Sequence, residues 1–266
     1  MELGIRDKIA IVTGGSGLIG SAVVQILFNE GAKVAIFDLN DKAGEELRDS
    51  LDPTGRRVQY VNCNIGDADS VHAAFDAVVK RFGTVDLLFN NAGINVSQTE
   101  RLPLDEFHDD AWQRIYHVNV GGSHNCTQAA LPIMRRNGGG RIVYTVSVVG
   151  GVVPFRNQCV FAATKASILN YARTIAMENA RYHIAANAVA PGSTPFKDVQ
   201  SFAFYNNDAK RDYFMSCIPA GRGANAFEIA SALVFLSSPS AASYVTGTLL
   251  VADGGWTAGY PRTIEE

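Results

Sequence analysis

The stretch that decides the fold is KIAIVTGGSGLIG, residues 8–20. It opens with a short run rich in Val and Ile, which predicts a buried β-strand over residues 8–13. The glycines that follow allow a tight turn and let the backbone approach a phosphate group, whose charge would meet the free N–H groups of a helix starting near Leu18. Glycine-rich turns occur in many loops, but one between a strand and a helix near the N-terminus is typical of a dinucleotide-binding fold.

Asp38 is the second part of this predicted nucleotide site and ends the next apolar run. A carboxylate there would accept hydrogen bonds from the adenosine ribose hydroxyls and would repel a 2′-phosphate. Lys42 is the nearest cation, and no Arg follows the turn or Asp38 closely enough to bind such a phosphate. We therefore expect NAD rather than NADP as the cofactor. The alternative is that Asp38 caps the helix expected to begin near Asp41.

The rest of the chain repeats this alternation of apolar runs and amphipathic stretches. Such a βαβ rhythm predicts a parallel sheet with helices on both faces. No internal repeat or linker divides the 266 residues, so we expect an α/β protein with a single doubly wound Rossmann domain over residues 1–266 and a seven-stranded parallel sheet. The strands are expected at 8–13, 33–38, 57–62, 85–90, 140–147, 184–190 and 248–252, and the helices are expected to begin near Leu18, Asp41, Asp67, Phe107, Gln158 and Ala226.

The composition argues against several classes of protein. With 23 Lys and Arg against 26 Asp and Glu, the formal charge is −3 and no basic block is present, so we expect neither a nucleic-acid nor a membrane partner. No apolar run approaches the ~18 residues of a spanning helix, and the N-terminus does not resemble a secretion signal. The four cysteines stand apart, without metal-ligand spacing. We expect a cytoplasmic protein with reduced thiols and no metal.

Six sequence markers, taken together, resemble the short-chain dehydrogenase/reductase family over nearly the whole chain. Members of that family move a hydride between a nicotinamide and a carbinol or carbonyl carbon. The resemblance implies an NAD-dependent alcohol dehydrogenase or ketoreductase with a small-molecule substrate. The markers are the glycine turn at 14–20, Asn90-Asn91-Ala92-Gly93, Asn119 in Val-Asn-Val-Gly-Gly, Ser147, Lys165 in Phe-Ala-Ala-Thr-Lys, and Pro191-Gly192, with the late Asp253-Gly254-Gly255 in addition.

The resemblance also implies roles for individual residues. Ser147 would donate to the substrate oxygen, Lys165 would supply positive charge and hold the nicotinamide ribose, and Asn119 would anchor a water that links the lysine to solvent. The expected catalytic positions are Ser147, Phe161, Lys165 and Asn119. The expected cofactor-binding residues are Gly14, Ser16, Gly17, Leu18, Ile19, Gly20, Asp38, Leu39, Asn64, Ile65, Asn91, Ala92, Gly93, Lys165, Pro191, Gly192 and Thr194.

Phe161 breaks the family pattern at its central position. The family's Tyr-x-x-x-Lys reads Phe161-x-x-x-Lys165 here, so the residue expected to carry the proton has no hydroxyl group. Loss of a positioned acid/base group typically costs about 10² to 10⁴ in rate, and we expect this form to be nearly inactive. Two explanations stay open. Either this is a Tyr-to-Phe form of an active enzyme, or Phe161 is native and the protein is a catalytically silent NAD-binding protein or uses Ser147 and water for a weaker reaction.

Two further departures mark a naturally divergent member of the family. Leu18 stands where single-domain members usually have glycine, and the resulting glycine spacing resembles extended relatives that act on nucleotide sugars. An isomerase or epimerase of a nucleotide sugar is therefore a further alternative. Asn64 replaces an aspartate that usually binds the adenine amino group, although an amide oxygen can accept the same hydrogen bond.

The substrate pocket is expected to combine Ser147 with three segments, 148–158, 94–97 and a substrate lid over 191–225. We expect Ser147, Val149, Phe155, Phe196 and Phe202 to contact the substrate, which predicts an alicyclic, aromatic or terpenoid-like secondary alcohol or ketone. The lid could instead be a short helical pair that packs its aromatic residues on the core. By resemblance we expect a homotetramer, with a dimer as the alternative.

Overall fold

The strands form one parallel sheet of seven, as the sequence predicts. The computed structural model describes residues 2–97, 99–194 and 207–259. The strand order is β3-β2-β1-β4-β5-β6-β7, and every neighbouring pair is parallel. The strands are β1 (Ile9–Thr13), β2 (Lys33–Asp38), β3 (Val58–Asn62), β4 (Leu87–Asn90), β5 (Gly140–Thr145), β6 (Ile184–Pro191) and β7 (Leu249–Ala252).

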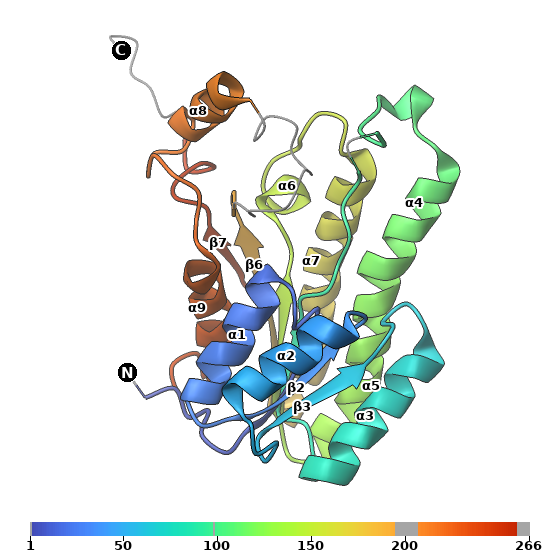
Figure 1. The fold of residues 1–266 in the computed structure, drawn as a ribbon, viewed down its shortest axis with the longest axis vertical. Coiled ribbons are helices and arrows are strands. Elements are labelled where there is room, and N and C mark those ends of the chain that lie inside the picture. The colour runs from blue at the N-terminus through green and yellow to red at the C-terminus, as the bar shows by residue number, and fades with distance from the viewer. Residues whose placement is uncertain (1, 98, 195–206, 260–266) are drawn as a thin grey trace.

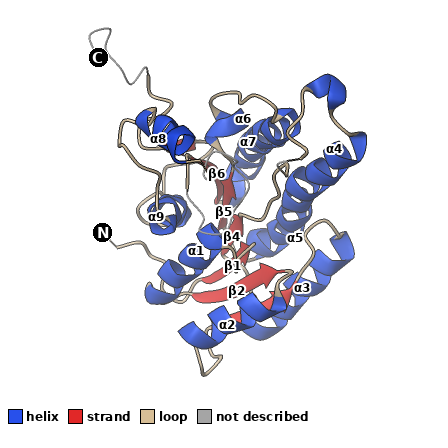
Figure 2. Ribbon diagram, turned by 45° about the horizontal axis from the view of Figure 1, so that its top comes forward, coloured by secondary structure: helices blue, strands red, loops and turns tan. Residues whose placement is uncertain are grey.

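Helices cover both faces of this sheet (Figure 1, Figure 2). One face packs against α1, α2 and α9, and the other packs against α3, α5 and α7. Among the described residues, no helix is both long and apolar enough to cross a membrane. The α-helices are α1 (Leu18–Asn29), α2 (Asp41–Leu51), α3 (Ala68–Phe82), α4 (Asp109–Tyr116), α5 (Gly122–Arg136), α6 (Val148–Gly151), α7 (Cys159–Asn179), α8 (Asp208–Ser216) and α9 (Ala226–Ser237), and short 3₁₀ turns lie at Leu104–Glu106 and Ala180–Tyr182.

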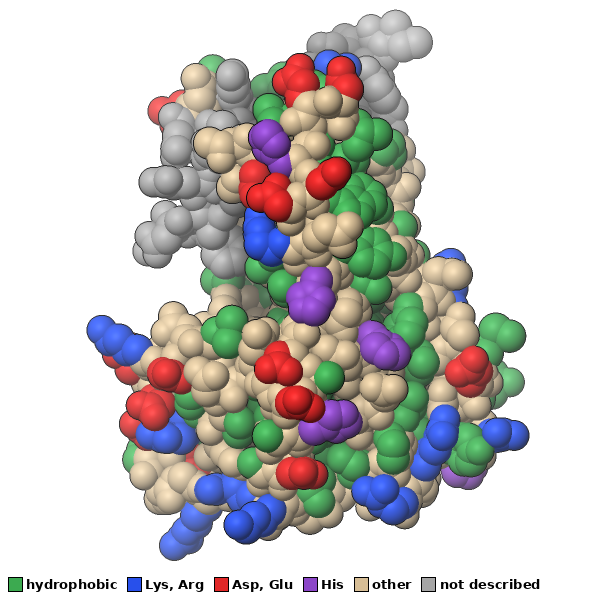
Figure 3. All heavy atoms as spheres, turned by 90° about the vertical axis from the view of Figure 1, so that its right-hand side faces the viewer, with side chains coloured by type: hydrophobic (Ala, Val, Ile, Leu, Met, Phe, Trp, Pro, Cys, Tyr) green, Lys and Arg blue, Asp and Glu red, His purple; other side chains and the backbone are tan. Residues whose placement is uncertain are grey.

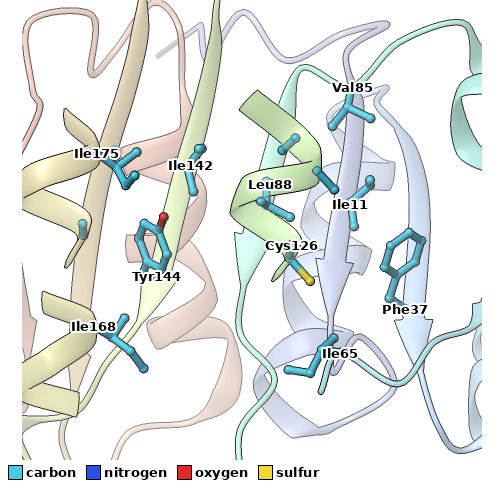
Figure 4. Close-up of a cluster of buried hydrophobic side chains, with 14 of the residues drawn as sticks. Ile11, Phe37, Ile65, Val85, Leu88, Cys126, Ile142, Tyr144, Ile168 and Ile175 are labelled. Carbon is cyan, nitrogen blue, oxygen red and sulfur yellow. The ribbon is translucent and has the colours of Figure 1, made fainter. Parts of the chain in front are cut away.

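The apolar runs form strands because both faces of the sheet are buried. On β1, Ile9 and Ile11 face the core shared with α3, α5 and α7, whereas Ala10 and Val12 face the core shared with α1 and α9. Successive side chains of a strand point to opposite faces, so a strand covered on both faces is apolar at every position. Figure 4 shows part of the first core, where Ile11 and Phe37 project from β1 and β2.

The strand ends differ slightly from the prediction. β4 begins at Leu87 rather than at residue 85. β5 ends at Thr145 rather than at residue 147, because Ser147 caps a helix: its Oγ accepts a hydrogen bond from the Val149 amide at 3.1 Å. The expected seventh strand begins one residue later, at Leu249.

The helix expected near Phe107 begins at Asp109 and is not a regular α-helix throughout. Between α4 and α5 the chain forms a π-helical turn over His117–Gly121. Such turns interrupt α-helices and are frequent at functional sites. This turn contains Asn119, which is fully buried.

The order of the strands creates a crevice between β1 and β4. The chain runs outward from β1 through β2 to β3 and then returns to place β4 on the other side of β1. The connections after β1 and β4 therefore leave the sheet in opposite directions. Ligands of open α/β sheets bind at such a point, outside the carboxyl ends of the strands.

Candidate active site

A cavity of about 980 Å³ lies at these carboxyl ends. Its walls include the ends of β1, β2 and β3, the loop after β4, the start of α7 and the turn after β6. The volume is large enough for a dinucleotide and a small substrate together. Of the residues expected to bind the cofactor, the following line the cavity: Gly14, Gly17, Leu18, Ile19, Asp38, Leu39, Asn64, Ile65, Asn91, Ala92, Gly93, Lys165, Pro191, Gly192 and Thr194.

The glycine turn has no room for a side chain at Gly20 and has positive φ at Gly14. Gly14 has φ +61°, and a Cβ on Gly20 would lie 2.0 Å from the Gly14 carbonyl oxygen. Gly17 precedes α1 without a capping side chain, so the first N–H groups of that helix remain available to an anion. Gly20 and Ser16 are not among the residues that line the cavity: Gly20 acts by letting α1 pack against the turn.

Asp38 connects the end of β2 to the glycine turn. Its Oδ2 accepts a hydrogen bond from the Ser16 amide at 3.0 Å, and its Oδ1 accepts one from the Leu39 amide at 2.8 Å. The N-cap of α2 is Asn40, whose side chain accepts from the Ala43 amide. The alternative that Asp38 caps this helix is therefore wrong: its Oδ1 also accepts from the Asn40 amide at 3.2 Å, before the helix begins, and Asp38 lines the cavity.

Asn64 lines the cavity at the end of β3, beside Ile65. Its Oδ1 accepts a hydrogen bond from the Gly66 amide at 3.1 Å within the same turn. An amide oxygen has two lone pairs, so this contact leaves one for an adenine amino group.

The loop after β4 lies between the two ends of the cavity and is hydrogen-bonded to the ends of β1 and β5. Thr13 Oγ1 accepts hydrogen bonds from the Asn91 and Ala92 amides, each at 3.0 Å. Thr145 Oγ1 donates to Asn91 Oδ1 at 3.1 Å. A Cβ on Gly93 would lie 3.1 Å from Asn119 Oδ1, a tight contact, and 3.5 Å from Lys165 Nζ, so a glycine lets this loop approach both side chains without crowding Asn119.

Lys165 and Phe161 lie one turn apart on α7, and both line the cavity. The Lys165 Nζ donates to the Thr145 carbonyl oxygen at 2.9 Å and lies 5.5 Å from the centre of the Phe161 ring. Burial lowers the pKa of the Lys165 ammonium from its ordinary 10.5 to about 8. The structure thus brings a buried cation beside the Phe161 ring.

Asn119 supports this centre from behind the cavity wall. Its Oδ1 accepts from the Ile94 amide at 2.8 Å, and its Nδ2 donates to the Ile94 carbonyl oxygen at 2.9 Å and to Thr164 Oγ1 at 3.2 Å. Asn119 is not one of the lining residues, and neither is His117. The π-helical turn, which the sequence pattern did not predict, places Asn119 against the Ile94 backbone.

Ser147 lines the cavity at the start of α6. Its Oγ accepts from the Val149 amide, which leaves the hydroxyl hydrogen free to donate to a ligand. The next turn is irregular: Gly150 has φ +87°, and a Cβ there would lie 2.2 Å from the Ala162 carbonyl oxygen. The glycine therefore lets the segment after Ser147 pack closely on α7 beside Phe161.

An apolar wall completes the substrate end of the cavity. The expected Val149 and Phe155 belong to it. Trp256, which sequence reasoning missed, contacts Phe155 and Phe214 with ring centroids 6.2 and 5.1 Å away. Asp253 folds the chain there by accepting from the Gly255 and Thr257 amides, and the recognised Asp-Gly-Gly motif was the signal for that turn. The expected contacts Phe196 and Phe202 lie outside the described residues.

The expected lid over 191–225 is described only in part. Residues 207–225 contain α8, whose Phe214 lines the cavity, and after Pro191, the last residue of β6, no strand is found in residues 192–194 and 207–225. Its role as a lid stays a prediction.

The donor set fits a nicotinamide dinucleotide. The glycine turn and the open end of α1 suit a pyrophosphate, and Asp38 suits a ribose diol. At the other end, Thr194 lines the cavity, and its Oγ1 is buried without a hydrogen-bond partner in the described structure. A buried hydroxyl of this kind is usually satisfied by a ligand or water.

Known proteins share this architecture over their whole length. The model of a family described as enoyl-(acyl carrier protein) reductase matches residues 15–257. The cis-4-hydroxycyclohexanecarboxylate dehydrogenase of Sinomonas cyclohexanicum is 36% identical over 252 residues, covering 95% of this chain and 97% of that protein. The 2,5-dichloro-2,5-cyclohexadiene-1,4-diol dehydrogenase of Sphingobium indicum is 36% identical over 256 residues, covering 96% and 98%.

A solved structure agrees with these relatives. The crystal structure of levodione reductase superposes with a TM-score of 0.88 at 32% identity, covering 96% of this chain and 99% of that chain. The fold thus agrees with full-length matches to dehydrogenases and reductases. The chain belongs to the short-chain dehydrogenase/reductase family.

Proposed function

We propose that this protein is an NAD-dependent oxidoreductase that transfers a hydride between nicotinamide and the carbinol or carbonyl carbon of a hydrophobic ring alcohol or ketone. The observation that carries the proposal is the single cavity, which joins Asp38 and the glycine turn at one end to Ser147, Lys165 and an apolar wall at the other.

Two observations support a six-membered ring substrate. The wall formed by Phe155, Phe214 and Trp256 suits an apolar ring rather than a charged molecule. The two curated relatives are named for cyclohexane or cyclohexadiene compounds with two oxygen-bearing groups, a hydroxycarboxylate in one case and a 1,4-diol in the other. We therefore extend the proposal to a cyclohexane-type alcohol or ketone.

The preference for NAD follows from charge. The Asp38 carboxylate would repel a 2′-phosphate. Among the described lining residues, the cations are Arg114, which is ion-paired with Glu100, and Lys165, which donates to Thr145. Neither is available to neutralise a 2′-phosphate beside Asp38.

The residues of the site suffice for binding and orientation. Bound NAD would supply the hydride acceptor. Ser147 would donate its hydroxyl hydrogen to the substrate oxygen, and the Lys165 ammonium would stabilise negative charge that develops there. The Phe161 ring can neither take nor give the substrate proton. We therefore propose that proton transfer limits this form and holds its turnover about 10² to 10⁴ below that of a tyrosine form.

Phe161 also favours a second candidate function, a catalytically silent NAD-binding protein. The two are separated by nicotinamide absorbance with cyclohexanol and NAD, or with cyclohexanone and NADH, measured on the protein as it stands and on Phe161→Tyr. The oxidoreductase proposal expects a gain of about a hundredfold or more in the tyrosine form. If neither form turns over while NADH binds to both, the silent-binder function takes its place.

We further propose a cytoplasmic homotetramer. All four cysteines are free thiols, which suits a reducing compartment. Apolar side chains are exposed on α4 and α7, with Tyr116 36% and Met177 83% accessible. Figure 3 views the molecule from the side of α3, α4 and α5, where hydrophobic side chains are exposed among charged ones. Light scattering coupled to gel filtration gives the mass, and a monomer would contradict the proposed assembly.

A further inference from the structure

Gln158 is a buried polar side chain that the mechanism above does not use. It is 1% exposed, and it lines the cavity immediately before α7. Its Oε1 and Nε2 both lack a hydrogen-bond partner in the described structure. It occupies the N-cap position of α7, yet its side chain makes no capping hydrogen bond.

An amide buried in this way requires a partner from outside the chain. The group has two N–H donors and a two-lone-pair acceptor, and burying it unpaired is unfavourable. Buried side-chain polar groups in native structures are nearly always satisfied by protein, water or ligand. Because Gln158 lines the cavity, a rotation of its side chain would bring the buried amide to a ligand there.

The position of Gln158 restricts which part of a ligand it can reach. It precedes Phe161 by three residues, a spacing that brings side chains to neighbouring positions at the start of a helix. Ser147 and Lys165, which address the reacting oxygen, line the same cavity, and so do the apolar rings of Phe155 and Trp256. Gln158 is therefore a polar residue on the substrate side of the cavity, among apolar groups.

We infer that Gln158 determines substrate specificity by hydrogen bonding to a second, uncharged oxygen of the ring substrate, a hydroxyl or a keto group. This rests on the proposed function, since it concerns the substrate of that same site. A neutral amide can donate to a carbonyl oxygen through Nε2 and can accept from a hydroxyl through Oε1, so both groups are compatible with it.

The charges around the cavity argue against a carboxylate as the second group. A buried carboxylate needs a cation as its partner. Arg114 is held by the Glu100 carboxylate, which also accepts from the Ser97 amide at 2.8 Å. Those hydrogen bonds lower the pKa of Glu100, so it stays negatively charged and would repel an anionic substrate near it. A carboxylate-bearing ring would have to break this ion pair.

The test measures binding to the protein–NADH complex by titration calorimetry. The ligands are cyclohexanone, cyclohexane-1,4-dione and 4-oxocyclohexanecarboxylate, and the low turnover expected with Phe161 allows binding to be measured before reduction. The variants are Gln158→Leu, which removes the amide, and Gln158→Glu, which keeps its shape but lacks donors when ionised. Gln128→Leu on the exposed face of α5 is the matched control.

We expect the unmodified protein and Gln128→Leu to bind the dione about tenfold more tightly than cyclohexanone, an affinity ratio of about ten. Gln158→Leu should lower that ratio to about one. Gln158→Glu should also weaken dione binding at a pH high enough to ionise its buried carboxyl, because an ionised carboxylate cannot donate to a carbonyl. NADH affinity should be unchanged in every variant, which also shows that each is folded. The carboxylate ligand should bind more weakly than the dione.

Three results would overturn the inference. Equal affinities for dione and cyclohexanone in the unmodified protein, or an unchanged ratio in both Gln158 variants, would show that the amide does not contact the ligand. Tightest binding of 4-oxocyclohexanecarboxylate would show that the second group is charged. In each case bound NADH leaves the proposed function standing, whereas a protein that binds no NADH would overturn the proposed function as well.

Discussion

The nucleotide end of the cavity and its reacting end are built in different ways. At the nucleotide end the cavity is shaped mainly by the main chain. Gly14 and Gly20 lie in a turn where an added Cβ would crowd backbone atoms, and the uncapped start of α1 leaves its first N–H groups available. At the reacting end the chemistry depends on individual side-chain atoms, chiefly those of Ser147, Phe161 and Lys165. Under the proposed function, the hydroxyl that Phe161 lacks changes what the reacting end can do without changing the cofactor end.

We infer that cofactor binding and catalysis can diverge separately in one fold. The Phe161 ring lies 5.5 Å from the Lys165 Nζ, so the two side chains are neighbours although the ring carries no hydroxyl group. We therefore expect changes at the nucleotide end to affect binding and stability together. Changes at the reacting end should affect turnover or titration while cofactor binding persists.

The largest expected effect is at Gly20. A Cβ there would lie 2.0 Å from the Gly14 carbonyl oxygen and 2.8 Å from the Gly15 Cα, both in the backbone of the turn. Gly20→Ala should weaken NADH binding by about a hundredfold or more and lower the free energy of unfolding by about 1–3 kcal/mol. Fluorescence titration and urea unfolding measure the two effects.

Gly259→Ala is the matched control for this change, because a Cβ on Gly259 would meet no atom within 4 Å. It should behave as the unmodified protein does. Near-normal NADH binding by Gly20→Ala would show that the turn is not held by the close approach of α1.

The next largest expected effect is a change of the unfolding free energy with pH, caused by the titration of Lys165. Because its pKa is about 8 when folded and 10.5 ordinarily, the unfolded chain binds more protons between these values. Burying the Lys165 ammonium destabilises the folded protein by its full amount below pH 8. This destabilisation disappears as the pH rises to 10.5. Relative to Lys165→Met, the unmodified protein should therefore gain up to about 3 kcal/mol in unfolding free energy over this range.

Urea unfolding of both proteins without cofactor at several pH values measures this difference. A difference that stays flat from pH 8 to 10.5 would mean that the lysine keeps its ordinary pKa. A relative loss of stability with rising pH would mean that its charged form is favoured by the fold.

The smallest expected effect is on the preference for NADH over NADPH at Asp38, and its neighbour Asn40 provides the control. Asp38→Ala should reduce the preference for NADH over NADPH by about tenfold, because the repulsion of a 2′-phosphate is lost. Asn40→Ala removes the α2 cap and should lower the unfolding free energy by about 1 kcal/mol, without changing that preference. Affinity titrations with NADH and NADPH measure this preference. An unchanged ratio of the two affinities in Asp38→Ala would remove the basis for expecting NAD.

The fold could be predicted because burial on both faces makes each strand visible as an apolar run. All seven strands, and the glycine turn with its helix, lie where the sequence indicates them. Ser147 ends β5 early because a hydroxyl that caps a helix competes with the continuation of the strand, and this competition is local and hard to see in an apolar run.

Other features depend on tertiary contacts that no local pattern contains. The π-helical turn at Asn119 coincides with its hydrogen bonds to Ile94, which is distant in sequence. Trp256 reaches the cavity because the Asp253 turn redirects the chain. Gln158 falls inside a segment expected to line the pocket, but only the structure shows that its amide is buried without a partner.

The central claim is that this chain keeps the nucleotide site of its family and lacks only the proton carrier. The most direct measurement compares the unmodified protein with Phe161→Tyr, recording NADH affinity by fluorescence and the reduction of cyclohexanone by absorbance at 340 nm, the usual nicotinamide wavelength. The account predicts equal NADH affinities and turnover at least about a hundredfold higher in the tyrosine form. Equal turnover in the two forms, or NADH binding only in the tyrosine form, would contradict it.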